Sequence, residues 1–173
     1  MAVASTKETG RFLTMAEGMR IVAAAKMWAG TPYGKKGGPY AGANPVKKKG
    51  ADCSGSTWKI YQEAGFSYGD YTSAAGFKTI VGTDKHFVPG EHFFKQVSVP
   101  QTGDIGWWSG HMVIYDPSIA QDSTLRGLQQ NPGTKSVWSA SSEKSTRNYG
   151  PAWSHWYSEG KPPIWYRYYK ATP

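Results

Sequence analysis

Cys53 is the one cysteine of the chain, and its surroundings favour covalent chemistry. It lies in the segment Asp52-Cys53-Ser54-Gly55, at the start of an apolar helical pattern over residues 53–64. A helix N-terminus stabilises a thiolate through its partial positive charge, and its unpaired amides can hold an oxyanion. Small Gly55 would let a substrate backbone approach. The alternative is a buried, inert thiol, which is the commoner fate of cysteine, and the local sequence leaves both open.

A nucleophilic cysteine needs a base, which is usually a histidine, and the chain has four. His86 and His92 lie in a turn-rich polar stretch, and His155 lies among aromatic residues that explain it by packing. His111 begins the alternating segment 111–115, and a strand there would hold its ring in place. We therefore single out His111 as the candidate base, with a purely structural histidine as the alternative.

The elements that would position this pair are two helices followed by strands. Thr14 and Glu17 form a capping-box pattern, and apolar residues then recur at helical spacing. The patterns predict two helices over 15–29 and 53–64, a short helix over 74–81, and a loop over 31–50. They also predict strands over 105–108, 111–115, 135–141 and 164–169, with a polar loop over 117–134. Helices first and strands later indicate an α+β fold. We expect residues 1–13 to be a flexible arm and residues 14–173 to be a single domain.

The composition limits the classes of partner. The formal charge of +8 favours polyanionic surroundings such as nucleic acid, an anionic membrane or an acidic wall polymer. No nucleic-acid-binding module is recognisable, and no apolar run is long enough for a membrane helix, so we expect neither nucleic acid binding nor membrane insertion. No cluster of His, Asp and Glu has metal-ligand spacing, so we expect no metal and no other cofactor. The first ten residues contain no apolar signal core, so we expect that the protein stays inside its cell, leaves it by another route or has already been trimmed.

Four segments, taken in order, resemble the NlpC-type cell-wall cysteine peptidases, a branch of the papain-like hydrolases. They are Ala29-Gly30-Thr31-Pro32-Tyr33, Asp52-Cys53-Ser54-Gly55, Thr102-Gly103-Asp104-Ile105 and Gly110-His111-Met112-Val113-Ile114-Tyr115. The resemblance covers roughly residues 15–141 and implies a papain-like fold in which N-terminal helices pack on a central antiparallel sheet. It also implies that Cys53 is the nucleophile and His111 the base.

Further roles are implied by the resemblance alone. Tyr33 matches a tyrosine that helps to bind the oxyanion, with a loop aromatic packed on the first helix as the alternative. Asp52 and Ser54 match positions that hold the free amine or backbone of a stem peptide, although Asp52 is also a good helix cap, and Ser73 lies near another substrate-contacting serine. The third catalytic position, often a histidine in the family, aligns with Ser139. A backbone carbonyl or Asn148 could replace it.

The resemblance implies a peptidoglycan amide hydrolase that cleaves the γ-D-glutamyl bond to a diamino acid in stem peptides. An N-acetylmuramoyl-L-alanine amidase, a cross-link endopeptidase, or a transferase or deamidase with the same pair remain alternatives. A noncatalytic wall-binding module is an alternative of another class. We expect action in the periplasm or cell wall, reached by contact-dependent injection as an antibacterial effector or by phage lysis. An injected effector would have an immunity protein that plugs its cleft.

Overall fold

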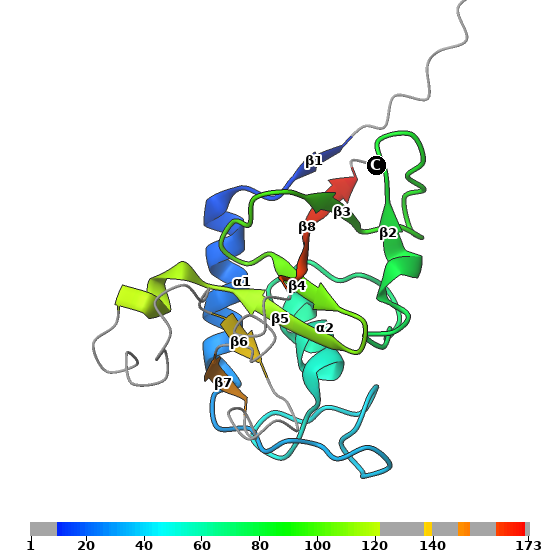
Figure 1. The fold of residues 1–173 in the computed structure, drawn as a ribbon. Helices are drawn as coiled ribbons and strands as arrows, with labels where there is room; N and C mark the ends of the chain where they lie inside the picture. The colour runs from blue at the N-terminus through cyan, green and yellow to red at the C-terminus, as the bar shows by residue number, and fades with distance from the viewer. Residues whose placement is uncertain (1–9, 122–136, 140–148, 153–161, 172–173) are drawn as a thin grey trace, which may run out of the picture.

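The computed structural model describes residues 10–121, 137–139, 149–152 and 162–171. In this part of the chain, helices α1 (Met15–Met27) and α2 (Cys53–Glu63) pack against each other, and α2 also packs against the sheet. Figure 1 shows α2 behind strands β4 and β5, with α1 beside it. The fold is therefore α+β, as predicted.

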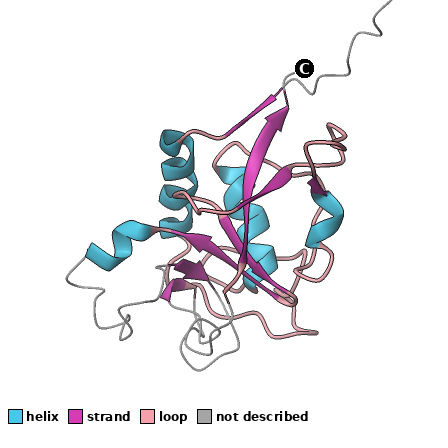
Figure 2. Cartoon of the chain, turned by 45° about the horizontal axis from the view of Figure 1, so that its top comes forward, coloured by secondary structure: helices cyan, strands magenta, loops and turns pink. Residues whose placement is uncertain are grey.

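The sheet is built around its longest strand, β8, which runs through the centre of the molecule (Figure 2). The strand order is β2 (Val81–Gly82), β3 (Phe94–Val97), β8 (Ile164–Ala171), β4 (Ile105–Trp108), β5 (His111–Tyr115), β6 (Val137–Ser139) and β7 (Gly150–Ala152). All neighbours pair antiparallel except β2 and β3, which are parallel. The expectation of an antiparallel sheet is wrong at that edge, because residues 83–93 form a connection long enough to return the chain to the same direction.

The predicted flexible arm is partly ordered. Its residues 10–12 form strand β1 (Gly10–Phe12), which pairs antiparallel with the end of β8, and Phe12 packs edge-on against Tyr169. The prediction of a loose arm is wrong for these residues, because pairing with a strand distant in sequence leaves no local pattern. Residues 1–9 of the predicted arm lie outside the described residues.

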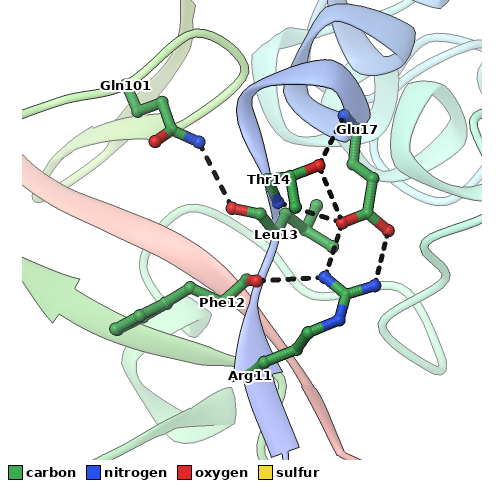
Figure 3. Close-up of polar contacts among 6 residues, drawn as sticks. All are labelled: Arg11, Phe12, Leu13, Thr14, Glu17 and Gln101. Carbon is green, nitrogen blue, oxygen red and sulfur yellow. Dashed lines mark hydrogen bonds and ion pairs between the residues drawn. The ribbon is translucent and has the colours of Figure 1, made fainter.

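Helix α1 begins with the predicted capping box. Thr14 Oγ1 accepts a hydrogen bond from the Glu17 amide at 3.2 Å, and Glu17 Oε1 accepts one from the Thr14 amide at 2.9 Å. Arg11 on β1 donates to the same Glu17 carboxylate, and Gln101 Nε2 donates to the Leu13 carbonyl (Figure 3). These contacts tie the start of α1 to β1 and to the turn before β4.

Most of the other elements confirm the predictions within a few residues. Strands β4 and β5 have the predicted bounds, a 3-10 helix (Phe77–Ile80) lies within the predicted 74–81, and β8 extends two residues beyond 169. Strand β6 lies within the predicted 135–141, and a second 3-10 helix (Pro117–Gln121) begins the predicted polar loop. The short strands β1, β2, β3 and β7 were not predicted.

An aromatic cluster fills the space between α2 and the sheet. Tyr61, Tyr68, Phe77, Phe94 and Tyr168 are buried and meet at ring-centroid distances between 4.9 Å (Phe77 to Phe94) and 6.4 Å (Tyr68 to Phe77). Such edge-to-face and tilted pairs add to the free energy gained by burying large rings. Much of the aromatic composition of this chain therefore belongs to the core that packs α2 against β3 and β8.

Candidate active site

Cys53 is the first residue of α2, and the packing of α2 against β5 brings its thiol to the β5 backbone. The amide of Met112 on β5 hydrogen-bonds to the Cys53 sulfur. Met112 directly follows His111, which is the first residue of β5. The fold thus places the positive end of α2 against the start of the strand that carries the candidate base.

The surroundings of the Cys53 thiol act on its ionisation in opposite directions. Burial raises the pKa of this thiol to about 11, and the nearby Asp52 charge acts in the same direction. Hydrogen bonds from the amides of Met112, Ser54 and Cys53 itself lower it, but by less. At neutral pH the thiol is therefore protonated and needs a base before it can attack. Cys53 as a whole residue is partly exposed and lines an open pocket, although burial of its thiol is the main cause of the raised pKa.

His111 is buried, and contacts from two strands fix its ring. The ring stacks on Trp108, its cross-strand partner, with centroids 5.8 Å apart. Ser139 on β6 lies with its Oγ 3.4 Å from His111 Nε2, and the same hydroxyl donates to the Met112 carbonyl at 3.3 Å. Because the one hydroxyl proton is used on the carbonyl, Oγ accepts from Nε2–H. This contact fits an imidazole that is protonated at Nε2.

The other imidazoles and the alternative third residue lie elsewhere. His86 is exposed, and His92 Nδ1 accepts a hydrogen bond from the Val88 amide at 2.9 Å. Asn148 and His155 lie outside the described residues. Among the described histidines, His111 alone lies on an element that contacts the Cys53 thiol.

Asp52 caps α2 and holds the preceding loop. Its Oδ1 accepts hydrogen bonds from the Gly55 amide at 2.8 Å and from Ser54 Oγ at 3.3 Å, and its Oδ2 accepts one from the Gly42 amide at 2.7 Å. Both carboxylate oxygens therefore bond to the protein itself. This geometry favours the helix-capping alternative for Asp52.

Gly55 has a different role from the one we expected. A Cβ atom at Gly55 would lie 2.3 Å from the carbonyl oxygen of Gly42 and 2.9 Å from Asp52 Oδ1. The small residue therefore admits the backbone of the loop over residues 31–51, and the expectation that it admits a substrate backbone finds no support in this packing.

Tyr71 is a site residue that sequence reasoning missed. Its hydroxyl lies 2.7 Å from Ser54 Oγ, and its ring packs edge-on against Trp58. Burial raises the pKa of Tyr71, so its hydroxyl stays protonated near neutral pH. The neighbouring Ser73 is exposed, and its Oγ accepts a hydrogen bond from the Gly76 amide at 3.1 Å. No spacing in the sequence links Tyr71 to the first turn of α2.

An open pocket of about 510 Å³ lies over the Cys53 thiol. Five of the predicted site residues line it: Tyr33, Asp52, Cys53, Ser54 and Ser73. His111 and Ser139 are buried and are not among its lining residues, although Gly110, which precedes His111, is. Lys36 and Tyr71 are lining residues that were not predicted. The arrangement offers a thiol, hydroxyl groups and one flexible cation to a ligand.

Within the described ranges, no group of three or more His, Cys, Asp or Glu side chains is placed to hold a metal ion. In the same part of the chain, no helix has the length and apolar character that crossing a bilayer requires. Comparisons with protein-family models, with curated proteins and with solved structures find no match to this chain.

Proposed function

We propose that the protein is a cysteine amide hydrolase that cleaves stem peptides of peptidoglycan, in the manner of the NlpC-type peptidases it resembles. The observation that carries the proposal is the contact between the start of α2 and the start of β5. The Cys53 thiol accepts a hydrogen bond from the amide of Met112, the residue after His111. The His111 ring lies against the Ser139 hydroxyl. The bond we expect to be cleaved joins γ-D-glutamate to a diamino acid.

The mechanism begins with proton transfer. Because burial raises the pKa of the Cys53 thiol to about 11, His111 acts as a general base and not as the partner of a preformed thiolate. The sulfur attacks the amide carbon, and the negative charge that develops on the oxygen is held by the Cys53 amide and by Tyr33. His111 then gives its proton to the leaving amine as the C–N bond breaks. Water hydrolyses the thioester, which releases the carboxylate and restores the thiol.

The test is digestion of purified sacculi by the wild type and by Cys53→Ala, with the soluble products identified by mass. Gln62→Ala, an exposed change on the same helix, is the matched control. We expect the wild type and the control to release fragments that end at γ-D-glutamate, and Cys53→Ala to release none. Equal release by the wild type and by Cys53→Ala would refute the thiol mechanism.

The product masses also separate the alternatives. An N-acetylmuramoyl-L-alanine amidase would free whole stem peptides from the glycan, and a cross-link endopeptidase would convert dimers into monomers. A transferase or deamidase would give products that carry another acceptor or have lost only ammonia. Sacculus binding by the wild type and by Cys53→Ala, without any turnover, would identify a noncatalytic wall-binding module.

The proposed site of action is the periplasm or cell wall of a bacterium, where stem peptides are found. If the protein is an antibacterial effector, its producer needs an immunity protein, and the open pocket over Cys53 is where we expect that protein to bind. Protection of Cys53 from alkylation in the complex would identify such a partner.

A further inference from the structure

Two cations face each other across β3 and β8, on the side of the sheet away from α2. Phe94 and Tyr168 are paired and belong to the aromatic core. The next pair along is Lys95 and Arg167, and successive residues of a strand face opposite sides of the sheet. Like charges directly opposite each other destabilise a sheet, and Lys95 is only 6% exposed. The fold therefore needs other groups to offset the repulsion at this position, and Lys95 Nζ lies 3.9 Å from the centroid of the Tyr169 ring.

This pair lines a second open pocket, of about 550 Å³. Its lining comprises Phe12, Gly82, Thr83, Asp84, Lys95, Gln96, Val97, Ser98, Val99 and Arg167. None of these residues lines the pocket over Cys53. The wall combines the two cations with apolar side chains and with hydroxyl and amide groups.

The carboxylates around this pair hold the two cations unequally. Arg167 donates from Nε and from Nη2 to the buried Asp104, at 3.0 Å and 2.9 Å, and from Nη2 to the Val99 carbonyl at 3.1 Å. Among the described residues, nothing accepts a hydrogen bond from its Nη1. Lys95 Nζ lies 3.1 Å from Asp84 Oδ1, but the Asp84 side chain is 95% exposed. An exposed carboxylate is held weakly, because ordering it costs entropy and water screens its charge.

We propose that this pocket is a second binding site, which takes the carboxylate group of a small organic acid or of a peptide C-terminus. The carboxylate of the ligand replaces that of Asp84 on Lys95 and accepts a hydrogen bond from Arg167 Nη1. The apolar side chains of Phe12, Val97 and Val99 contact the rest of the ligand. The inference does not depend on the proposed hydrolase activity.

The charge count favours a carboxylate over a phosphate group. In the ion pairs of the described residues, Lys95 pairs with Asp84 and Arg167 pairs with Asp104, one carboxylate for each cation. A ligand carboxylate that replaces Asp84 on Lys95 keeps one carboxylate for each of these two cations. A phosphate monoester carries nearly two negative charges at neutral pH and would leave the pocket with an excess of negative charge.

The test is an NMR titration of the full chain, in which the amides of Gly82, Thr83 and Ser98 report on the pocket. The probes are acetyl-alanyl-alanine, its C-terminal amide, sodium acetate and inorganic phosphate. We expect saturable shifts with the free acid and none with the amide. Acetate shows whether a carboxylate alone is enough for binding. Comparable affinities of acetate and the peptide acid identify a small organic acid as the ligand. Tighter binding of the peptide acid identifies a peptide C-terminus.

Two variants make the test specific. Asp84→Asn removes the competing carboxylate from an exposed position, so it should fold normally and lower the Kd about two- to fivefold. Asp70→Asn makes the same change in net charge on an exposed loop and should leave the Kd unaltered. The proposal is overturned by absent saturation with either carboxylate, by equal binding of acid and amide, by tighter binding of phosphate, or by an unchanged or weaker affinity in Asp84→Asn.

Discussion

At the scale of single residues, the site depends on how His111 is held. Its ring lies between the indole of Trp108 and the Ser139 hydroxyl, both on neighbouring strands. Ser139 also donates to the Met112 carbonyl, on the strand whose amide contacts the Cys53 thiol. One small hydroxyl therefore links the orientation of the base to the backbone beside the nucleophile, which makes it a positioning residue in the proposed mechanism.

Removing that hydroxyl should reduce the rate without weakening substrate binding. We expect Ser139→Ala to lower kcat about tenfold with KM unchanged, because the imidazole loses the contact that selects its tautomer. NMR of the labelled His111 ring nitrogens tests whether the tautomer is the cause. It should show Nε2–H in the wild type and a mixture of tautomers in Ser139→Ala. Ser139→Thr keeps the hydroxyl and should restore the rate. Wild-type kcat in Ser139→Ala would show that the contact has no part in turnover.

The residue patterns predicted some contacts and missed others for a physical reason. The place of Cys53 at a helix start and of His111 at a strand start follows from local periodicity, and the structure has both. The contact between Ser54 and Tyr71 depends on the irregular path of residues 64–76, which carries no periodic pattern. The hydrogen bond that occupies Asp52 Oδ2 likewise depends on where the loop places the Gly42 amide. Local sequence cannot specify contacts that loops create.

At the scale of elements, predictability follows the range of the interactions that form each element. Strands β4 and β5 pair through a tight turn, so their alternation is visible within one short segment. Strands β1 and β3 are short and are held by β8, which lies far along the chain. The capping box of α1 is local and was predicted, whereas the ion pair between Arg11 and Glu17 depends on the position of β1.

That ion pair makes the start of α1 sensitive to acid. Hydrogen bonds from Arg11 and from the Thr14 amide lower the pKa of Glu17 to about 2, from an ordinary value of 4.5. Because the folded-state pKa is depressed, this stabilisation is present above pH 4.5 and is lost as the pH falls towards 2. Urea unfolding of the wild type should therefore show a free energy that drops through this window more steeply than in Glu17→Gln. Parallel curves would contradict the assignment, and the exposed Glu91→Gln is the control.

At the scale of the whole molecule, the proposed cleft exists because the loop over residues 31–51 lies close against α2. The Gly34 amide donates to the Ala51 carbonyl, and the Asp52 carboxylate then holds the Gly42 amide at the first turn of the helix. Tyr33 and Lys36 reach the pocket only because of this path. The nucleophile depends on α2 and the base on the sheet, so the loop is the third component that turns their contact into a pocket.

Gly55 tests this dependence, because two effects act on it in opposite directions. Replacing glycine by alanine inside a helix ordinarily stabilises it by about 1 kcal/mol. Here the added methyl group would lie 2.3 Å from the Gly42 carbonyl oxygen, so the loop must move away, at a cost of about 1–3 kcal/mol. We expect packing to dominate, so that Gly55→Ala lowers the free energy of urea unfolding and, if the proposed activity holds, raises KM for the proposed stem-peptide substrate as the loop leaves the pocket. Gly150→Ala, where no atom of the described residues lies within 4 Å of the new Cβ, should not lower the free energy of unfolding and should leave KM unchanged. A Gly55→Ala protein as stable and active as the wild type would show that the cleft does not need this close approach.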